Sequence, residues 1–156
     1  MNYQSTRDSE NKKVTSAQAI KQGLADDGGL FVPDEIPVLT KDDILALSSL
    51  SYAERAADIL SRFLTDYTYD ELLADCKNAY SDTSFVGGAA PLKNIHDNIY
   101  SLELWHGPTA AFKDMALQIM PRLLSRALVK TGEKRTALIL VATSGDTGKA
   151  ALEGYK

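Results

Sequence analysis

The segment HGPTAAFKD, residues 106–114, places Lys113 just after a glycine–proline turn and in the first turn of a predicted helix. Thr109 has the residue type and position of an N-cap for that helix. The positive end of a helix disfavours a cation, and Phe112 adds an apolar neighbour. Both features favour a neutral, nucleophilic amine, which a lysine that forms an imine with a carbonyl compound needs. The alternative is a surface lysine paired with Asp114.

The segment ATSGDTGKAA, residues 142–151, follows an apolar run and opens a second predicted helix. Its small residues let a ligand approach the backbone, and N–H groups at a helix start bind a carboxylate or a phosphate. It is not a Walker A loop, because only two residues separate Gly145 from Gly148 and Ala150 follows Lys149. The alternative is an ordinary strand-to-helix turn.

Other reactive side chains are few. The two histidines, His96 and His106, have no cysteine or acidic grouping at metal-ligand spacing, so no metal site is expected. The single cysteine, Cys76, recurs at helical spacing with Leu72 and Leu73. It is therefore predicted to lie in the core rather than to act as a nucleophile.

The composition restricts partners and location. The chain has 156 residues, 44% of them hydrophobic, and a formal net charge of −4. An acidic balance argues against nucleic acid or an anionic membrane surface as the main partner. No apolar run approaches the length of a membrane span, and the first residues lack the apolar core of a secretory signal. One cysteine fits a reducing compartment, so a cytoplasmic protein is expected.

The first half is predicted to be helical. Four pairs have the spacing of a capping box, in which two side chains satisfy the unpaired N–H groups at a helix start. They are Thr15 with Gln18, Thr40 with Asp43, Ser51 with Glu54, and Thr68 with Glu71. A short strand is expected at 30–32, after a glycine turn. Residues 1–82 are therefore interpreted as a helical domain.

The pattern changes in residues 83–156. Apolar runs at 91–95 and 99–105 predict a hairpin, and an amphipathic stripe predicts a helix over 113–131 that Pro121 kinks. The unbroken apolar run at 137–142 predicts a strand covered on both faces.

The order strand, helix, strand predicts a βαβ unit, so the fold class is α/β, with 83–156 as the beginning of a parallel-sheet domain. A lone βαβ unit has open strand edges and uncovered faces. We therefore expect a truncated protein that self-associates.

Four segments resemble the threonine synthase family. They are YQSTR near the start, QGLADDGGLFVPDEIP at 22–37, LELWHGPTAAFKD at 102–114 and ATSGDTG at 142–148. The first two distinguish this family from other pyridoxal-phosphate (PLP) enzymes of fold type II, which share the lysine and a similar loop.

The resemblance implies PLP as cofactor and assigns roles to particular residues. Lys113 matches the lysine that binds the cofactor covalently and then acts as general acid and base. Asp146 matches the residue that contacts the cofactor's 3-hydroxyl. The loop that holds the substrate carboxylate is matched by Ser144, Gly145, Thr147 and Gly148, together with Asp146.

The reaction implied is that of a PLP-dependent carbon–oxygen lyase, which converts O-phospho-L-homoserine and water into L-threonine and phosphate. The family's glycine-rich cup for the cofactor phosphate and the residue facing the pyridine nitrogen have no match in this chain, so the chain alone is expected to be inactive. Two alternatives are another fold type II PLP enzyme, such as threonine dehydratase, and a non-catalytic helical interaction module.

Overall fold

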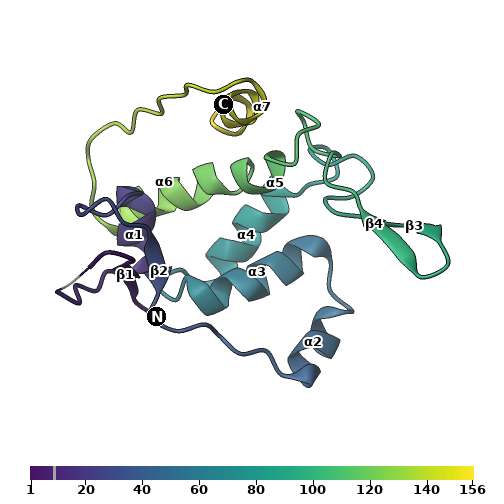
Figure 1. The fold of residues 1–156 in the computed structure, drawn as a ribbon, viewed down its shortest axis with the longest axis horizontal. Helices are drawn as coiled ribbons and strands as arrows, with labels where there is room; N and C mark the ends of the chain where they lie inside the picture. Colours follow the sequence, from purple (N-terminus) through teal and green to yellow (C-terminus); the bar gives the residue numbers. More distant parts are fainter. Residues whose placement is uncertain (9) are drawn as a thin grey trace.

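A computed structural model describes residues 1–8 and 10–156, which form seven helices and two small sheets (Figure 1). The helices are α1 (Ser16–Gln22), α2 (Lys41–Leu47), α3 (Tyr52–Phe63), α4 (Tyr69–Ala79), α5 (Asp114–Leu117), α6 (Met120–Lys130) and α7 (Asp146–Gly154). The strands are β1 (Tyr3–Ser5), β2 (Phe31–Pro33), β3 (Leu92–His96) and β4 (Ile99–Leu102). The chain is thus mixed α and β. No helix in the described ranges is long and apolar enough to cross a membrane.

Local side-chain signals start the first four helices. Each begins with a complete capping box, and all four pairs predicted from spacing are formed. In α3, for example, the backbone N–H of Ser51 donates to Glu54 Oε2 at 2.8 Å, and the backbone N–H of Glu54 donates to Ser51 Oγ. Such caps satisfy N–H groups that have no partner within the helix, so the prediction of helix starts is confirmed.

The N-terminal strand belongs to a small sheet that contacts the end of α3. β1 pairs antiparallel with β2, so that Ser5 lies opposite Phe31. The short strand predicted at 30–32 is confirmed with a shift of one residue, whereas β1 was not predicted. The Tyr3 hydroxyl donates to the carbonyl oxygen of Phe63 at 3.1 Å and ties this sheet to the end of α3.

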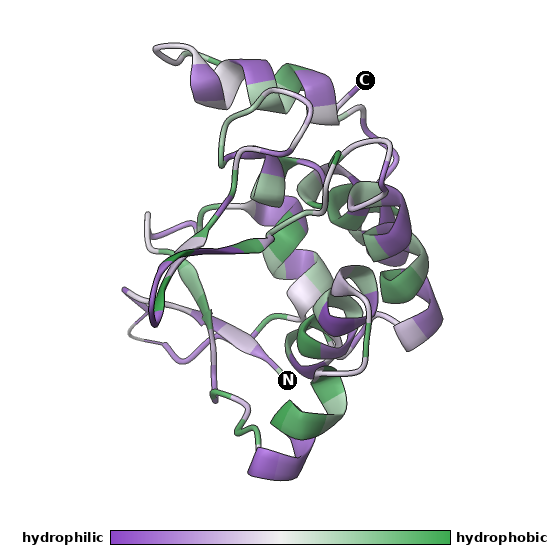
Figure 2. Ribbon diagram, turned by 90° about the vertical axis from the view of Figure 1, so that its right-hand side faces the viewer, coloured by the Kyte–Doolittle hydropathy of each residue, from purple (hydrophilic) through white to green (hydrophobic). Residues whose placement is uncertain are grey.

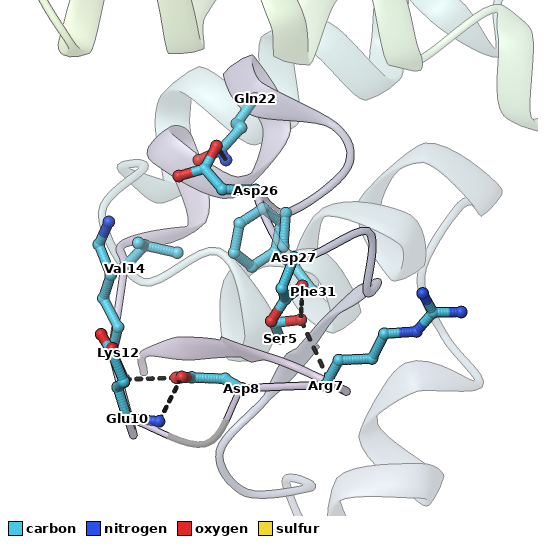
Figure 3. A pocket seen from close by; sticks show the side chains of 11 residues that line it. Ser5, Arg7, Asp8, Glu10, Lys12, Val14, Gln22, Asp26, Asp27 and Phe31 are labelled. Carbon is cyan, nitrogen blue, oxygen red and sulfur yellow. Dashed lines mark hydrogen bonds between the residues drawn. The ribbon is translucent and has the colours of Figure 1, made fainter.

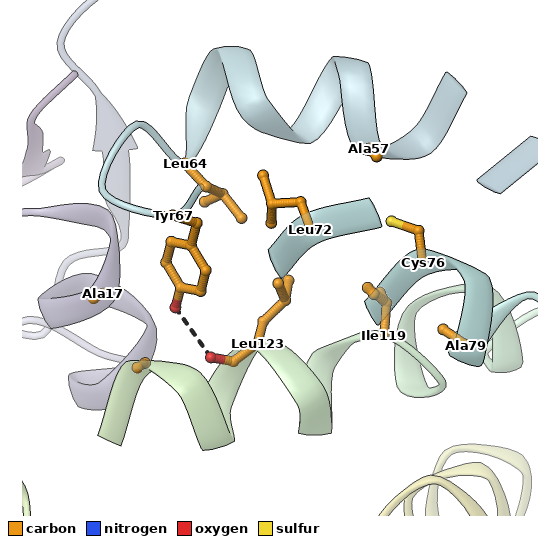
Figure 4. Close-up of a cluster of buried hydrophobic side chains, with 10 residues drawn as sticks. Ala17, Ala57, Leu64, Tyr67, Leu72, Cys76, Ala79, Ile119 and Leu123 are labelled. Atoms are coloured by element: carbon orange, nitrogen blue, oxygen red, sulfur yellow. Dashed lines mark hydrogen bonds between the residues drawn. The ribbon is translucent and has the colours of Figure 1, made fainter. Parts of the chain in front are cut away.

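The core lies between α1, α3, α4 and α6 (Figure 4). Its buried members are Ala17, Ala57, Leu64, Tyr67, Leu72, Cys76, Ala79, Ile119, Leu123 and Ala127. Cys76 is fully buried, as predicted, and burial raises the pKa of its thiol to about 11. The Tyr67 hydroxyl donates to the carbonyl oxygen of Leu123 at 3.0 Å, so this buried phenol keeps a partner. α6 therefore packs into the same core as the helices of the first half.

Ion pairs reinforce the contact between α4 and α6. Arg126 binds Asp75 through two nitrogens, with Nη2 at 3.0 Å from Oδ1, and Asp75 is nearly buried. One turn away along both helices, Lys130 Nζ lies 2.8 Å from Glu71 Oε2. The two-nitrogen geometry of the Arg126 pair makes it the stronger of these links.

One long helix over 113–131 was predicted, and the structure corrects this. The helical region is divided into α5 and α6, with the break at residues 118–119. Pro121 lies in the first turn of α6, where its missing N–H leaves no helical hydrogen bond unmade. The proline therefore marks a new helix start rather than a kink.

The predicted hairpin is confirmed. β3 and β4 pair antiparallel, with Leu92 opposite Leu102, and they project from the helices in Figure 1. Figure 2 shows hydrophobic segments along this hairpin. Leu92, Ile95, Ile99 and Leu102 are all more than half exposed. An exposed apolar surface of this kind is unusual in an isolated monomer.

The strand predicted at 137–142 is not formed, and with it the βαβ unit and its parallel pairing are absent from the described residues. Both sheets there are antiparallel pairs. The segment instead runs extended above α6 toward α7 in Figure 1, and Leu138 and Leu140 are 79% and 86% exposed. A strand needs a neighbour to accept its hydrogen bonds, and no neighbour pairs with this segment here.

Candidate functional site

Lys113 stands at the start of α5, in the N-cap position, at the end of the turn that covers residues 107–112. Its side chain is half-buried, and Nζ lies 4.8 Å from the centroid of the Phe112 ring. The ring is itself 61% exposed, so the amine and the ring lie together at the surface. In the described part of the chain no carboxylate lies within ion-pair distance of this amine.

The N-cap role predicted for Thr109 is wrong. α5 starts at Asp114 with Lys113 as its N-cap, and Thr109 is instead a donor to Asp114. The backbone N–H of Thr109 donates to Asp114 Oδ2 at 2.8 Å, and its hydroxyl donates to Oδ1, also at 2.8 Å. Asp114 is fully buried and does not pair with Lys113. The structure therefore rules out the alternative, an ion pair between Lys113 and Asp114.

His106 braces the chain just before this turn. Its Nδ1 lies 3.0 Å from the carbonyl oxygen of Val86, and its Nε2 lies 2.8 Å from Glu103 Oε2. The ring also stacks on Trp105, with centroids 5.7 Å apart. Both nitrogens of His106 thus have partners, one a backbone carbonyl and the other a side-chain carboxylate. The other histidine, His96, is exposed in the hairpin beside Asp97.

The predicted anion-binding loop opens α7. Gly145 occupies the N-cap position with φ 149°, a conformation that favours glycine. Thr143 Oγ1 accepts hydrogen bonds from the backbone N–H groups of Gly145, at 3.2 Å, and Gly148, at 2.9 Å. The loop residues Ser144, Gly145, Asp146 and Thr147 are exposed. The loop is therefore shaped by Thr143, and its outer face is open to solvent.

The structure brings the two predicted segments onto neighbouring helices. α7 packs against α5, the helix that Lys113 begins (Figure 1). At the far end of α7, a Cβ on Gly154 would overlap the carbonyl oxygen of Leu117, so a glycine permits the close contact. No hydrogen bond joins Lys113 to residues 144–148 in the described part of the chain.

A separate cavity of about 390 Å³ lies beside β1 and α1 (Figure 3). Its lining mixes acidic and basic side chains and includes Ser5, Arg7, Asp8, Lys12, Asp26 and Asp27. Two of its carboxylates bond to a hydroxyl and to backbone N–H groups. Asp27 accepts from Ser5 Oγ at 2.7 Å and from the N–H of Gly29 at 2.8 Å, and Asp8 accepts from the N–H of Glu10 at 2.7 Å. Neither Lys113 nor the 144–148 loop lines this cavity.

The family model described as threonine synthase N terminus matches residues 2–80. The chain belongs to this family. Threonine synthase of Pseudomonas aeruginosa is 41% identical over 159 residues, which cover 100% of this chain and 33% of that protein. Threonine synthase of Saccharomyces cerevisiae is 34% identical, over 99% of this chain and 32% of that protein. The chain thus spans about a third of the length of these curated relatives.

Solved structures agree with this placement in the family. The PLP-bound threonine synthase from Brucella melitensis superposes with a TM-score of 0.89 at 39% identity, over 99% of this chain and 33% of that one. The threonine synthase from yeast gives the same TM-score at 38% identity. The threonine synthase resemblance predicted from four sequence segments is confirmed, and so is the mixed α/β class.

Asp114, Glu103 and Val86 were not identified from sequence as parts of this site. Asp114 is a carboxylate directly after Lys113, and this position was the one sign in the sequence that it could belong to the site. Val86 lies 20 residues before His106, and nothing in the spacing links the two.

Proposed function

We propose that this chain supplies the cofactor lysine of a threonine synthase, and that Lys113 is this residue. The observation that carries the proposal is the half-buried primary amine of Lys113, which has no carboxylate partner in the described residues. It follows a turn that the hydrogen bonds between Thr109 and Asp114 hold in place. Such an amine suits covalent attachment to an aldehyde such as PLP. When bound, PLP supplies the electron sink for reaction at the substrate's carbon atoms, while the protein orients the substrate and transfers protons to it.

The roles of the chain's residues follow from their positions. Lys113 would hold the cofactor and then move protons at the substrate carbon atoms. The start of α7 suits a carboxylate, so the proposed substrate-binding residues are Ser144, Gly145, Thr147 and Gly148. The N–H groups of Gly145 and Gly148 donate to Thr143 Oγ1 in the structure, so a bound carboxylate would share them with this hydroxyl. Asp146 would contact the cofactor's 3-hydroxyl. Contact between α5 and α7 supports the placement of both segments around one ligand.

The reaction proposed is the conversion of O-phospho-L-homoserine and water into L-threonine and phosphate, a carbon–oxygen lyase reaction in threonine biosynthesis in the cytoplasm. The 156-residue chain is proposed to be inactive alone. We also propose a division into a helical domain, 1–82, and the beginning of a PLP-binding domain, 83–156. The family match, which ends at residue 80, supports this boundary.

A chimera tests this function. The matching third of the Pseudomonas aeruginosa threonine synthase is replaced by this chain, and phosphate release from O-phospho-L-homoserine is measured with PLP present. The chimera is expected to turn over, and Lys113→Ala is expected to reduce turnover to background. Lys149→Ser is the matched control, because no chemical role is proposed for this exposed lysine. The Lys149→Ser chimera should retain most of the activity. A chimera with Lys113→Ala that still turns over would contradict the assignment.

We propose in addition that the chain associates with itself. Exposed apolar side chains on the β3–β4 hairpin (Leu92, Ile99) and on the extended segment (Leu138, Leu140) offer an uncovered surface. The edges of the hairpin also carry unpaired backbone groups. Light scattering of the purified chain should therefore give a mass above that of a monomer. A monodisperse monomer at high concentration would reject this proposal.

A further inference from the structure

The carboxylate of Asp114 is buried without a cation. Its exposed fraction is 0%, and in the described ranges no lysine, arginine or histidine lies within ion-pair distance of it. Burial of an unpaired charge is costly unless strong hydrogen bonds compensate for it. Here both oxygens are occupied by one residue, Thr109, through its N–H and its hydroxyl. The carboxylate is thus used as a double acceptor.

These two bonds hold a constrained loop. Gly107 lies so close to the carboxylate that a Cβ there would be 2.6 Å from Asp114 Oδ2. Ala110 has φ 59°, a left-handed conformation that is uncommon for alanine, and its N–H donates to the Gly107 carbonyl at 3.1 Å. Such conformations persist where the surroundings fix them, and they gather at functional sites. Asp114 lies at the centre of these contacts and directly follows Lys113.

We propose that Asp114 is the positioning residue for Lys113. Its carboxylate folds the 107–112 turn back onto the start of α5, and this fixes the direction in which the lysine leaves the backbone. Asp114 itself touches no ligand. The inference rests on the proposed function of Lys113 and adds what holds that lysine in place.

Three substitutions separate this role from a general effect on folding. Asp114→Asn keeps both bonds, because its amide oxygen accepts from the Thr109 N–H and its NH₂ donates to the Thr109 hydroxyl. Asp114→Ala removes both, and Thr109→Val removes only the hydroxyl bond. The matched control is Asp70→Ala, which changes an exposed aspartate in the first turn of α4.

The first measurement is hydrogen exchange of the Thr109 amide by NMR in the 156-residue chain. Asp114→Ala should speed exchange by roughly tenfold, the equivalent of losing one hydrogen bond. Asp114→Asn and Asp70→Ala should leave the rate near that of the wild type. This measurement does not depend on the function of Lys113.

The second measurement is labelling of the same chain with PLP, followed by borohydride reduction and peptide mapping. In the wild type, the ratio of label on Lys113 to label on exposed Lys149 should exceed one. Asp114→Ala should bring this ratio toward one, because a freed backbone no longer orients the amine. Thr109→Val should lower it partly, and Asp114→Asn should preserve it.

The outcomes are distinct. A ratio that Asp114→Ala leaves unchanged, or an Asp114→Asn chain that behaves like Asp114→Ala, overturns the positioning role. If circular dichroism shows that Asp114→Ala does not fold, Thr109→Val decides: a lowered ratio supports the role, and an unchanged one overturns it. A wild-type ratio of one rejects the proposed function of Lys113, and with it this inference, even when the Thr109 amide is protected.

Discussion

Leu72→Ala is expected to lower the free energy of unfolding by about 3 kcal/mol, the typical cost of removing three buried carbon atoms from a close-packed site. Leu72 lies on α4 and is fully buried at the centre of the core in Figure 4, between α3 and α6. The cavity would remove packing between α6 and the helices of the first half, and α6 is joined through α5 to the turn that holds Lys113. Urea unfolding followed by circular dichroism measures the change.

Leu45→Ala is the matched control, because Leu45 is a helical leucine in α2 that is 57% exposed. Its effect should stay within about 0.5 kcal/mol, as for most surface substitutions. If Leu72→Ala cost no more than Leu45→Ala, the arrangement of α6 on α3 and α4 would be wrong.

The features that could be predicted from sequence are those fixed within a few residues. A capping box spans four positions, so Thr15 and Gln18 specify a helix start without help from the rest of the chain. The β3–β4 hairpin is similar, because two short apolar runs flank a polar turn. The burial of Cys76 followed from helical spacing with leucines. In each case the determining contact is local.

The features that could not be predicted depend on partners elsewhere in the chain. An apolar run such as 137–142 has the composition of a buried strand, but composition does not supply a hydrogen-bonding neighbour, and no strand forms. The brace from His106 to Val86 crosses 20 residues. The break before Pro121 shows a third limit: a proline is compatible with both a kinked helix and a helix start, and the sequence pattern around it did not distinguish the two.

The site lies between these cases. The type and motif of Lys113 indicated an amine for covalent chemistry, and the structure adds a half-buried position beside Phe112. Thr109 was expected to cap the helix, because threonine is one of the preferred N-cap residues. It bonds instead to a carboxylate within the helix itself. The residue types were informative, whereas the pairing between Thr109 and Asp114 depends on how the chain folds.

The identity of the cofactor lysine is tested most directly by trapping it. The Pseudomonas aeruginosa chimera that contains this chain is saturated with PLP, reduced with borohydride, digested and mapped by mass spectrometry. The chimera is expected to be yellow and to lose its visible absorption band on reduction, with one equivalent of label on Lys113 and none on Lys149. In the Lys113→Ala chimera both the band and the label should be absent. Stoichiometric label on any other lysine of the wild-type chimera would contradict the assignment of Lys113.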